Sequence, residues 1–219
     1  MLYIVATPIG NLDDITLRAL EVLKKVDIIA CEDTRQTKKI LDRYQFQKSL
    51  TSYYEHNKLA KGDYLIKLLK EGKDIAVVSD SGTPGISDPG FHIAKLALEQ
   101  GLQVTPIPGA CALVAALSAS GIPADRFIFQ GFLPKKSGQR KKILTDLSQL
   151  DKTIVLYESP YKFIQLLSEI KEIFGEVEVA VNRELTKKFE EIKKDKISNL
   201  IAHFVSKKIL GEFVLVIQR

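Results

Sequence analysis

Short apolar runs alternate with amphipathic segments through the first half of the chain, and this alternation restricts the possible folds most strongly. The strand-like runs, which are rich in Val, Ile, Leu and Tyr, are residues 2–6, 26–31, 49–54, 73–79 and 102–107. The helix-like segments between them are residues 13–25, 34–44, 58–72 and 90–101. Alternation of strand and helix predicts a parallel sheet with helices on both faces.

The pattern changes after residue 120. Further strand-like runs are residues 126–132, 152–159, 176–185, 188–193 and 211–218, and the helix-like segments are 136–150, 161–175 and 196–208. Because the last three strand-like runs can pair locally, we expect a mixed sheet in this half. The sequence predicts two α/β domains, an N-terminal lobe over 1–120 and a C-terminal lobe over 121–219.

Composition is that of an ordinary globular protein, with 45% hydrophobic and 27% charged residues among 219. Two isolated cysteines, Cys31 and Cys111, and three scattered histidines predict neither a disulfide framework nor a metal site. No basic segment precedes the first apolar run, and Gly and Pro interrupt the apolar stretch 107–124. We therefore expect a cytoplasmic protein.

Three loops rich in glycine and proline follow predicted strands, and they are TPIGN (7–11), SDSGTPGISDPG (79–90) and PGACA (108–112). Ligands of open α/β sheets bind beyond the carboxyl ends of the strands, where these loops should lie. Glycine lets the backbone approach a ligand closely, and proline limits the ordering entropy of the loop. A single such loop would only indicate the end of a strand, but three of them favour a shared ligand site.

Several common nucleotide and hydrolase motifs are absent from the sequence. It has no G-x-G-x-x-G, no G-x-x-x-x-G-K-[ST] and no G-x-S-x-G. The three loops therefore predict a pocket lined by backbone and small side chains with little fixed charge, which suits a nucleoside-like ligand.

Seven blocks, in order over nearly the whole chain, carry a resemblance to a known family. They are ATPIGNLDDITLRAL, ACEDTRQTKKIL, VSDSGTPGISDPG, PIPGACALVAALSASGIPADRFIFQGFLPKK, YESPYK, RELTKKFEE and GEFVLVI. Together they resemble the bacterial 16S ribosomal RNA (cytidine-2′-O)-methyltransferases of the tetrapyrrole methylase superfamily.

The resemblance implies a two-lobed tetrapyrrole-methylase-like α/β fold with S-adenosylmethionine in the cleft, usually as a homodimer. It implies methylation of the ribose 2′-hydroxyl of a decoding-centre cytidine of 16S rRNA in the small ribosomal subunit. Carried over by motif, the cofactor-binding residues are Pro8, Ile9, Gly82, Thr83, Pro84, Ile86, Gly109, Cys111, Ala112 and Tyr157.

The chain departs from the family pattern at three places. Ala110-Cys111 stands where Pro-Ser is usual, which replaces a hydroxyl with a weak thiol donor. Tyr161-Lys162 stands where His-Arg is common, at the expected substrate rim. Many members continue beyond GEFVLVI, so we expect a substrate-binding extension to be missing.

Four residues are candidates for catalysis. A ribose hydroxyl is weakly acidic, and a general base contributes about 10²–10⁴-fold. Glu32 and Asp33 follow the second predicted strand on the ligand side, although CEDTR also fits a helix start with an acidic cap. Glu158 and Lys187 are the candidates of the second lobe, where paired charges more often stabilise structure.

The net charge of +5 includes one strongly basic segment, KKSGQRKK, at residues 135–142. This segment is either a solvated helix start or a phosphate-binding surface for RNA. The predicted RNA-binding residues are Arg35, Lys135, Lys136, Arg140, Lys141 and Lys142. Tyr53, Tyr54 and His56 either stack on a splayed base or lie half-buried at a strand edge.

Two other functions stay open at this point. One is methylation of a small tetrapyrrole, which the basic segment disfavours. The other is a non-catalytic RNA-binding ribosome-assembly factor, which the intact Gly-Pro pattern of the three loops disfavours.

Overall fold

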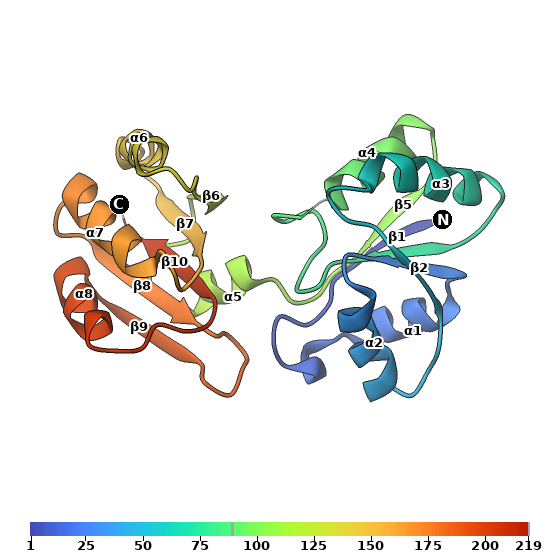
Figure 1. Ribbon diagram of the computed structural model, residues 1–219, viewed down its shortest axis with the longest axis horizontal. Coiled ribbons are helices and arrows are strands. Elements are labelled where there is room, and N and C mark those ends of the chain that lie inside the picture. Colours follow the sequence, from blue (N-terminus) through green and yellow to red (C-terminus); the bar gives the residue numbers. More distant parts are fainter. Residues whose placement is uncertain (89, 219) are drawn as a thin grey trace. The chain divides into compact units, whose positions relative to one another are not determined.

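The computed structural model describes residues 1–88 and 90–218, and the chain divides into two units, Met1–Cys111 and Ala112–Arg219 (Figure 1). The boundary expected from the sequence, at residue 121, lies just beyond helix α5 (Ala112–Ala119), which the division assigns to the second unit. No helix in the described ranges is both long enough and apolar enough to cross a membrane.

The first unit contains the predicted parallel sheet. Its strands, in spatial order, are β3 (Ser49–Ser52), β2 (Ile28–Cys31), β4 (Ile75–Val78), β1 (Leu2–Val5) and β5 (Val104–Ile107), and every neighbouring pair is parallel. Leu2 pairs with Ile75 on one side and with Val104 on the other. The carboxyl ends of β4, β1 and β5 are therefore neighbours at one edge of the sheet.

Helices cover both faces of this sheet, as predicted. They are α1 (Leu17–Lys25), α2 (Thr34–Arg43), α3 (Lys58–Lys70) and α4 (Gly90–Glu99), with a short 3-10 helix at Leu12–Asp14. Leu23 of α1 and Ile40 of α2 belong to one apolar cluster, while Leu65 of α3 and Ile93 of α4 belong to another. Side chains of β4 alternate between the two clusters, since Ala76 and Val78 join the first and Ile75 and Val77 the second.

The second unit contains the predicted mixed sheet. Its spatial order is β6 (Phe127–Phe132), β7 (Thr153–Glu158), β10 (Phe213–Ile217), β8 (Glu178–Arg183) and β9 (Glu191–Lys196). Only the β6–β7 pair is parallel. The expected local pairing of the last three strands is correct, because β8 pairs with both β9 and β10, and β10 also pairs with β7 on its other side.

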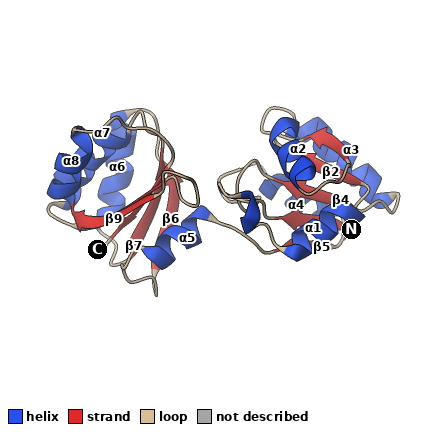
Figure 2. Ribbon diagram, turned by 90° about the horizontal axis from the view of Figure 1, so that it is seen from below, coloured by secondary structure: helices blue, strands red, loops and turns tan. Residues whose placement is uncertain are grey.

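Three helices pack on one face of this second sheet, as Figure 2 shows, and they are α6 (Ser137–Ser148), α7 (Phe163–Phe174) and α8 (Ile197–Val205). Their side chains and alternate residues of β7, β8 and β10 form a single core. Phe163 stacks on Phe213 at its centre, with ring centroids 4.0 Å apart.

Two predicted strand limits are wrong because of the backbone between β8 and β9. Glu184 and Thr186 have left-handed φ values of 51° and 64°, which strands do not accommodate. Strand β8 accordingly ends at Arg183 rather than 185, and β9 begins at Glu191 rather than 188.

Candidate functional site

The three Gly-Pro loops meet at the carboxyl edge of the first sheet. Thr7 and Gly82 form a β-bridge, with N···O distances of 2.9 and 3.2 Å. Thr83 Oγ1 donates to the carbonyl oxygen of Ala110 at 3.0 Å, which joins the second loop to the third. The strand order thus brings together three segments that the sequence places up to 100 residues apart.

Glycine is required at the two tightest contacts between these loops. Gly82 has a φ of +87°, and a Cβ on it would lie 3.2 Å from Ile9 Cγ2 and 3.6 Å from the Ala110 oxygen. A Cβ on Gly109 would lie 2.8 Å from Ala6 Cβ, closer than carbon atoms approach. The loops therefore form one continuous surface that a larger side chain would disrupt.

The predicted cofactor residues of the first unit are of two kinds, buried residues that support the loops and accessible residues that form their surface. Pro8, Ile9, Gly82 and Pro84 are buried, Thr83 and Cys111 are half-buried, and Ile86 and Gly109 are exposed. The accessible part is backbone, a hydroxyl, a thiol and an aliphatic side chain. Backbone, hydroxyl and apolar groups suit a nucleoside-like ligand, and Asp80 of the second loop adds an exposed carboxylate.

The remaining two predicted cofactor residues lie in the second unit, and both are half-buried. The Tyr157 hydroxyl accepts a hydrogen bond of 2.9 Å from the amide of Leu113, the residue after Ala112. Its ring contacts those of Phe129 and Phe132, with centroids 4.8 and 5.6 Å away. Tyr157 thus tethers the start of α5 to the sheet.

The two aspartates of SDSGTPGISDPG have structural partners. Asp88 Oδ1 accepts from the amides of Gly85 and Gly90, both at 2.7 Å, and so joins the loop to the start of α4. Asp80 Oδ1 accepts from the amide of Asp33 at 2.9 Å, which links this loop to the start of α2. Pro89 of this stretch lies outside the described residues.

Glu32 and Asp33 have contrasting environments. Asp33 caps α2 by accepting from the Arg35 amide at 2.8 Å, and its ion pair with Arg35 (2.6 Å) lowers its pKa to about 2. Glu32 is exposed at the residue level, but partial burial of its carboxyl, followed by the charges of Asp80 and Asp88, raises its pKa. Of the two, Glu32 has the greater affinity for a proton.

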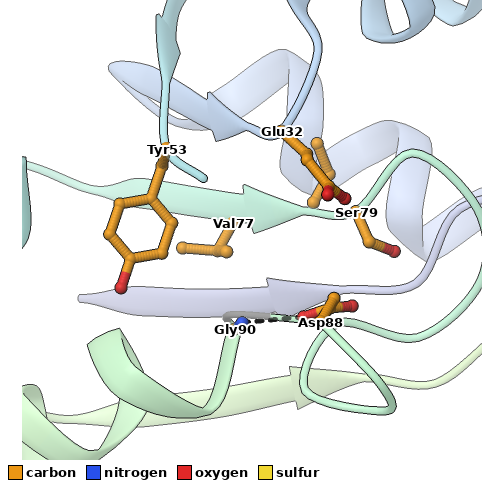
Figure 3. A pocket seen from close by; sticks show the side chains of 7 residues that line it. Glu32, Tyr53, Val77, Ser79, Asp88 and Gly90 are labelled. Carbon is orange, nitrogen blue, oxygen red and sulfur yellow. Dashed lines mark hydrogen bonds between the residues drawn. The ribbon is translucent and has the colours of Figure 1, made fainter. Parts of the chain in front are cut away.

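Glu32 borders a small hollow, shown in Figure 3, whose other lining residues are Tyr53, Val77, Val78, Ser79, Asp88 and Gly90. Its volume of about 180 Å³, including space open to solvent, is below the roughly 300 Å³ that a drug-sized ligand requires. The hollow therefore adjoins the loop surface without being a complete cofactor pocket.

Tyr53 is not available to stack on a base. It is buried, its hydroxyl is 3.0 Å from His92 Nδ1, and burial raises its pKa to about 12. The neighbouring Tyr54 and His56 are exposed.

Both catalytic candidates of the second unit have structural contacts. Glu158 is buried, and its Oε1 accepts from the amide and hydroxyl of Ser159 at 2.7 and 3.1 Å. Lys187 forms ion pairs with Glu184 and Glu212 at 2.9 and 2.8 Å. Burial tends to lower the pKa of Lys187, but these hydrogen bonds outweigh it and raise the pKa, so the amine stays protonated.

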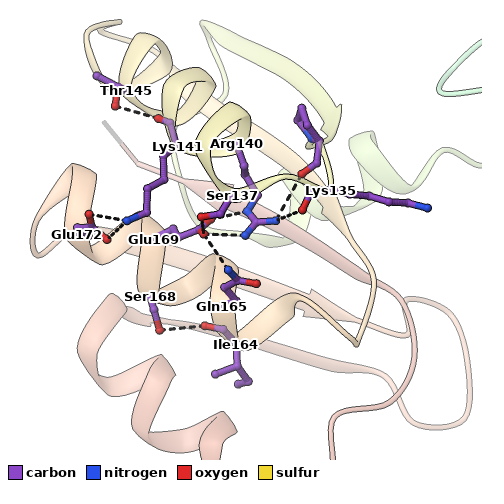
Figure 4. A network of polar contacts seen from close by, with 11 residues as sticks. Lys135, Ser137, Arg140, Lys141, Thr145, Ile164, Gln165, Ser168, Glu169 and Glu172 are labelled. Carbon is purple, nitrogen blue, oxygen red and sulfur yellow. Dashed lines mark hydrogen bonds and ion pairs between the residues drawn. The ribbon is translucent and has the colours of Figure 1, made fainter.

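Arg140 does not belong to the predicted RNA-binding surface, and Figure 4 shows why. Its side chain is only 1% exposed and its guanidinium forms an ion pair with Glu169. Nη1 donates to the carbonyl oxygens of Pro134 and Lys135, both at 3.4 Å. Arg140 therefore holds the segment before α6 in place from beneath.

The other predicted RNA-binding residues remain at the surface to different degrees. Lys135, Lys136 and Lys142 are exposed. Lys141 is paired with Glu172 at 2.7 Å, and Arg35 is 87% exposed although it is paired with Asp33. No group of three or more metal-ligating side chains occurs in the part of the chain that the structure describes.

Sequence comparison assigns the family. The profile of the tetrapyrrole (corrin/porphyrin) methylases matches residues 1–201. The chain belongs to the tetrapyrrole methylase family. The methyl donor of this family is S-adenosylmethionine, in agreement with the backbone, hydroxyl and apolar groups that the three loops offer.

The chain is similar to two relatives that are both called "Ribosomal RNA small subunit methyltransferase I". The protein of Bacillus subtilis is 49% identical over 218 residues, covering 100% of this chain and 75% of the relative. That of Thermotoga maritima is 44% identical, covering 99% and 97%. The identity extends over both units and is not confined to the loops.

Solved structures confirm the tetrapyrrole methylase fold. A diphthine synthase superposes with a TM-score of 0.77 at 14% identity, covering 99% of this chain and 89% of its own. A cobalt precorrin-4 methyltransferase gives a TM-score of 0.72 at 18% identity, covering 99% and 94%. At such identities the likeness concerns the fold alone.

The hydrogen bonds of the Thr7 hydroxyl to the second loop were not predicted from the sequence. Thr7 Oγ1 lies 3.0 and 3.3 Å from the carbonyl oxygens of Ser79 and Gly82, and all three residues are buried. A threonine directly before the Pro of the first loop was the available signal, because a buried hydroxyl needs a partner.

Proposed function

We propose that this chain transfers a methyl group from S-adenosylmethionine to the ribose 2′-hydroxyl of a cytidine in the decoding centre of 16S rRNA. The observation that carries the proposal is the 44–49% identity, over both units, to relatives called ribosomal RNA small subunit methyltransferase I. The choice of cytidine and of the 2′-hydroxyl rests on the family resemblance of the seven sequence blocks. The expected location is the cytoplasm, where ribosomal subunits are assembled.

The proposed chemistry needs rigid positioning and a proton acceptor. When bound, S-adenosylmethionine would supply a methyl group on a sulfonium, from which a neutral thioether is a good leaving group. The three cross-linked loops hold their surface still, and positioning of reactants contributes several kcal/mol. We assign Glu32 to take the hydroxyl proton, because its raised pKa makes it a better proton acceptor than Asp33. Asp33 caps α2 and is ion-paired with Arg35.

For the RNA we propose a phosphate-binding surface formed by Lys135, Lys136 and Lys142 of the second unit, with Lys141 as a neighbouring charge. Arg35 of the first unit is a separate proposed contact. The first three side chains are exposed, and Arg140 fixes the backbone that carries Lys135. A fixed basic surface binds phosphates without the cost of ordering a loop. We further propose a homodimer, as the resemblance implies, and sedimentation equilibrium measures it directly.

Transfer of a labelled methyl group tests the proposal. The protein is incubated with methyl-labelled S-adenosylmethionine and small ribosomal subunits from cells that lack the modification. Digestion of the rRNA should yield label in 2′-O-methylcytidine and in no other nucleoside. Parallel reactions contain deproteinised 16S rRNA or a tetrapyrrole in place of the subunits.

Each result other than the expected one identifies a different function. Label in the tetrapyrrole alone would mean a small-molecule methylase. Subunit binding without label, by protein that binds the cofactor, would mean a non-catalytic assembly factor. Label in another nucleoside would refute the cytidine assignment while retaining the rRNA methyltransferase.

A further inference from the structure

The loop between β8 and β9, residues 184–190, contains unusual backbone. Glu184 and Thr186 adopt left-handed φ values of 51° and 64°. This conformation is uncommon for residues other than glycine, and for a β-branched residue such as threonine it is an outlier. Strained residues persist where the surrounding structure holds them, and they cluster at functional sites.

The segment that leads into β10, at Gly211 and Glu212, braces the first half of the loop. Glu184 N donates to the Glu212 carbonyl oxygen and Glu212 N donates to Glu184 Oε1, both at 2.9 Å. The Lys187 ammonium bridges the Glu184 and Glu212 carboxylates. Gly211, with a φ of +92°, has no room for a Cβ because the Glu184 side chain occupies that space.

The second half of the loop is closed by its own backbone. Lys187 N donates to the Glu184 oxygen at 3.0 Å, and Glu190 N donates to the Lys187 oxygen at 3.1 Å. Thr186 N donates to the Glu190 carboxylate at 2.6 Å. Leu185 is buried and anchors the loop in the unit. The loop is therefore rigidly held although it lies at the end of a hairpin.

This rigid loop presents an aromatic ring to solvent. Phe189 is 68% exposed, so burial of its ring does not explain the bracing. The Lys188 ammonium lies 5.6 Å from the centroid of that ring. An exposed aromatic ring beside a cation is the arrangement on which proteins stack single-stranded bases.

We propose that loop 184–190 is an RNA contact in which Phe189 stacks on an unpaired base of the substrate and Lys188 contacts the adjoining phosphate. The proposal rests on the proposed function, because that function supplies the RNA. The core of a protein–protein interface is depleted of charge, whereas Phe189 is flanked by Lys187, Lys188 and Glu190. A nucleic acid therefore fits this surface better than a second protein.

The test compares variants in binding and in methyl transfer with small ribosomal subunits that lack the modification. Phe189→Ala should weaken subunit binding and raise KM for subunits by about tenfold, the loss of one base–aromatic stack. Its kcat and its affinity for S-adenosylmethionine should stay as in the wild type. Phe189→Trp should restore subunit binding and KM to their wild-type values, because a larger ring stacks at least as well.

Two further variants complete the design. Leu98→Ala removes a side chain of similar exposure (64%) from α4 in the other unit, and its KM should not change. Lys188→Glu should reduce the salt dependence of subunit binding by the equivalent of about one phosphate contact. Thermal melting of each variant confirms that the fold is retained.

The outcomes separate this inference from the proposed function. If the wild type methylates rRNA and Phe189→Ala has wild-type KM and subunit affinity, the loop is not an RNA contact. If Phe189→Ala loses kcat alone, the residue does not act through binding and the inference also fails. If the wild type neither binds nor labels the subunits, the proposed function falls, and the inference with it.

Discussion

Glu32 and Asp33 are adjacent carboxylates with opposite pKa shifts. Asp33 accepts a hydrogen bond as the cap of α2 and is ion-paired with Arg35, whereas Glu32 borders a hollow and lies near two other acids. A base that works near neutral pH benefits from a raised pKa, and one held at about 2 is a weak proton acceptor. Asp33 is thus suited to a structural role and Glu32 to accepting a proton.

Substitution of each residue tests this division. Glu32→Gln should lower kcat for rRNA methylation by about 10²-fold or more, and remove the acid limb of its pH profile. Asp33→Asn should keep most of the activity, because asparagine is also a good helix cap, whereas Asp33→Ala removes the cap and should lower the stability. Equal loss of kcat in both conservative variants would contradict the assignment.

The raised pKa of Glu32 also has a consequence for stability. A carboxyl that is harder to ionise in the folded protein contributes its full stability below its unfolded pKa, near 4.5, and loses it as pH rises through the folded value. Glu32→Gln should therefore be neutral at pH 4 and slightly stabilising at pH 8 in urea denaturation. The effect should be small because Glu32 is exposed to solvent.

Gly82 is a position at which the loop surface does not accommodate a side chain. A valine there would require a strained φ and would collide with Ile9. Gly82→Val should abolish binding of S-adenosylmethionine in calorimetry while the second unit stays folded. Gly138→Val, at a position with open space around it, is the matched control and should bind normally. Unchanged affinity in folded Gly82→Val would remove this loop from the cofactor site.

At the scale of elements, helix α6 carries a buried ion pair beneath a basic surface. Glu169 of α7 binds Arg140 and also accepts from Ser137 Oγ at 2.8 Å and Gln165 Nε2 at 3.2 Å. The network links α7, the start of α6 and the segment before it (Figure 4). Its effect is to hold the backbone at Pro134 and Lys135, directly before α6.

Breaking one side of this pair should be costly. Glu169→Ala leaves a buried guanidinium without its partner and should destabilise the protein by about 3–5 kcal/mol. The double variant Arg140→Met, Glu169→Leu should recover most of that loss in denaturation, since it removes both charges. If the segment needs this clamp, the double variant should still bind subunits more weakly than the wild type. Wild-type subunit affinity in the double variant would show that Lys135 and Lys136 do not depend on the ion pair.

At the scale of the whole molecule, each unit has its own apolar core. The clusters of the first unit are formed within residues 2–107, and that of the second within residues 133–217. We expect fragments 1–111 and 112–219, produced separately, each to show helical circular dichroism and a cooperative thermal transition. A fragment that remains unfolded would show that its unit depends on the other.

Much of this architecture could be predicted from the sequence, and the exceptions have physical causes. The alternation of apolar and amphipathic segments predicted both sheets. The glycine and proline content of the loops predicted that the loops of Gly82 and Gly109 lie close together. Both signals are local in the sequence. Burial of Arg140 was missed since its partner Glu169 is 29 residues away. A local signal did exist, because Arg140 lies four and seven residues before Leu144 and Leu147, both buried on the same helix face. The left-handed residues of loop 184–190 depend on distant Glu212, which no local pattern shows.

The position of β1 has a consequence for how the protein folds during synthesis. The first strand to be made pairs with residues 75–77 and 104–107, so its two neighbours are among the last parts of that unit to appear. Contacts between residues so far apart in sequence form slowly. Until residue 107 has left the ribosome, β1 has an unpaired edge, and a strand of another chain can pair with it.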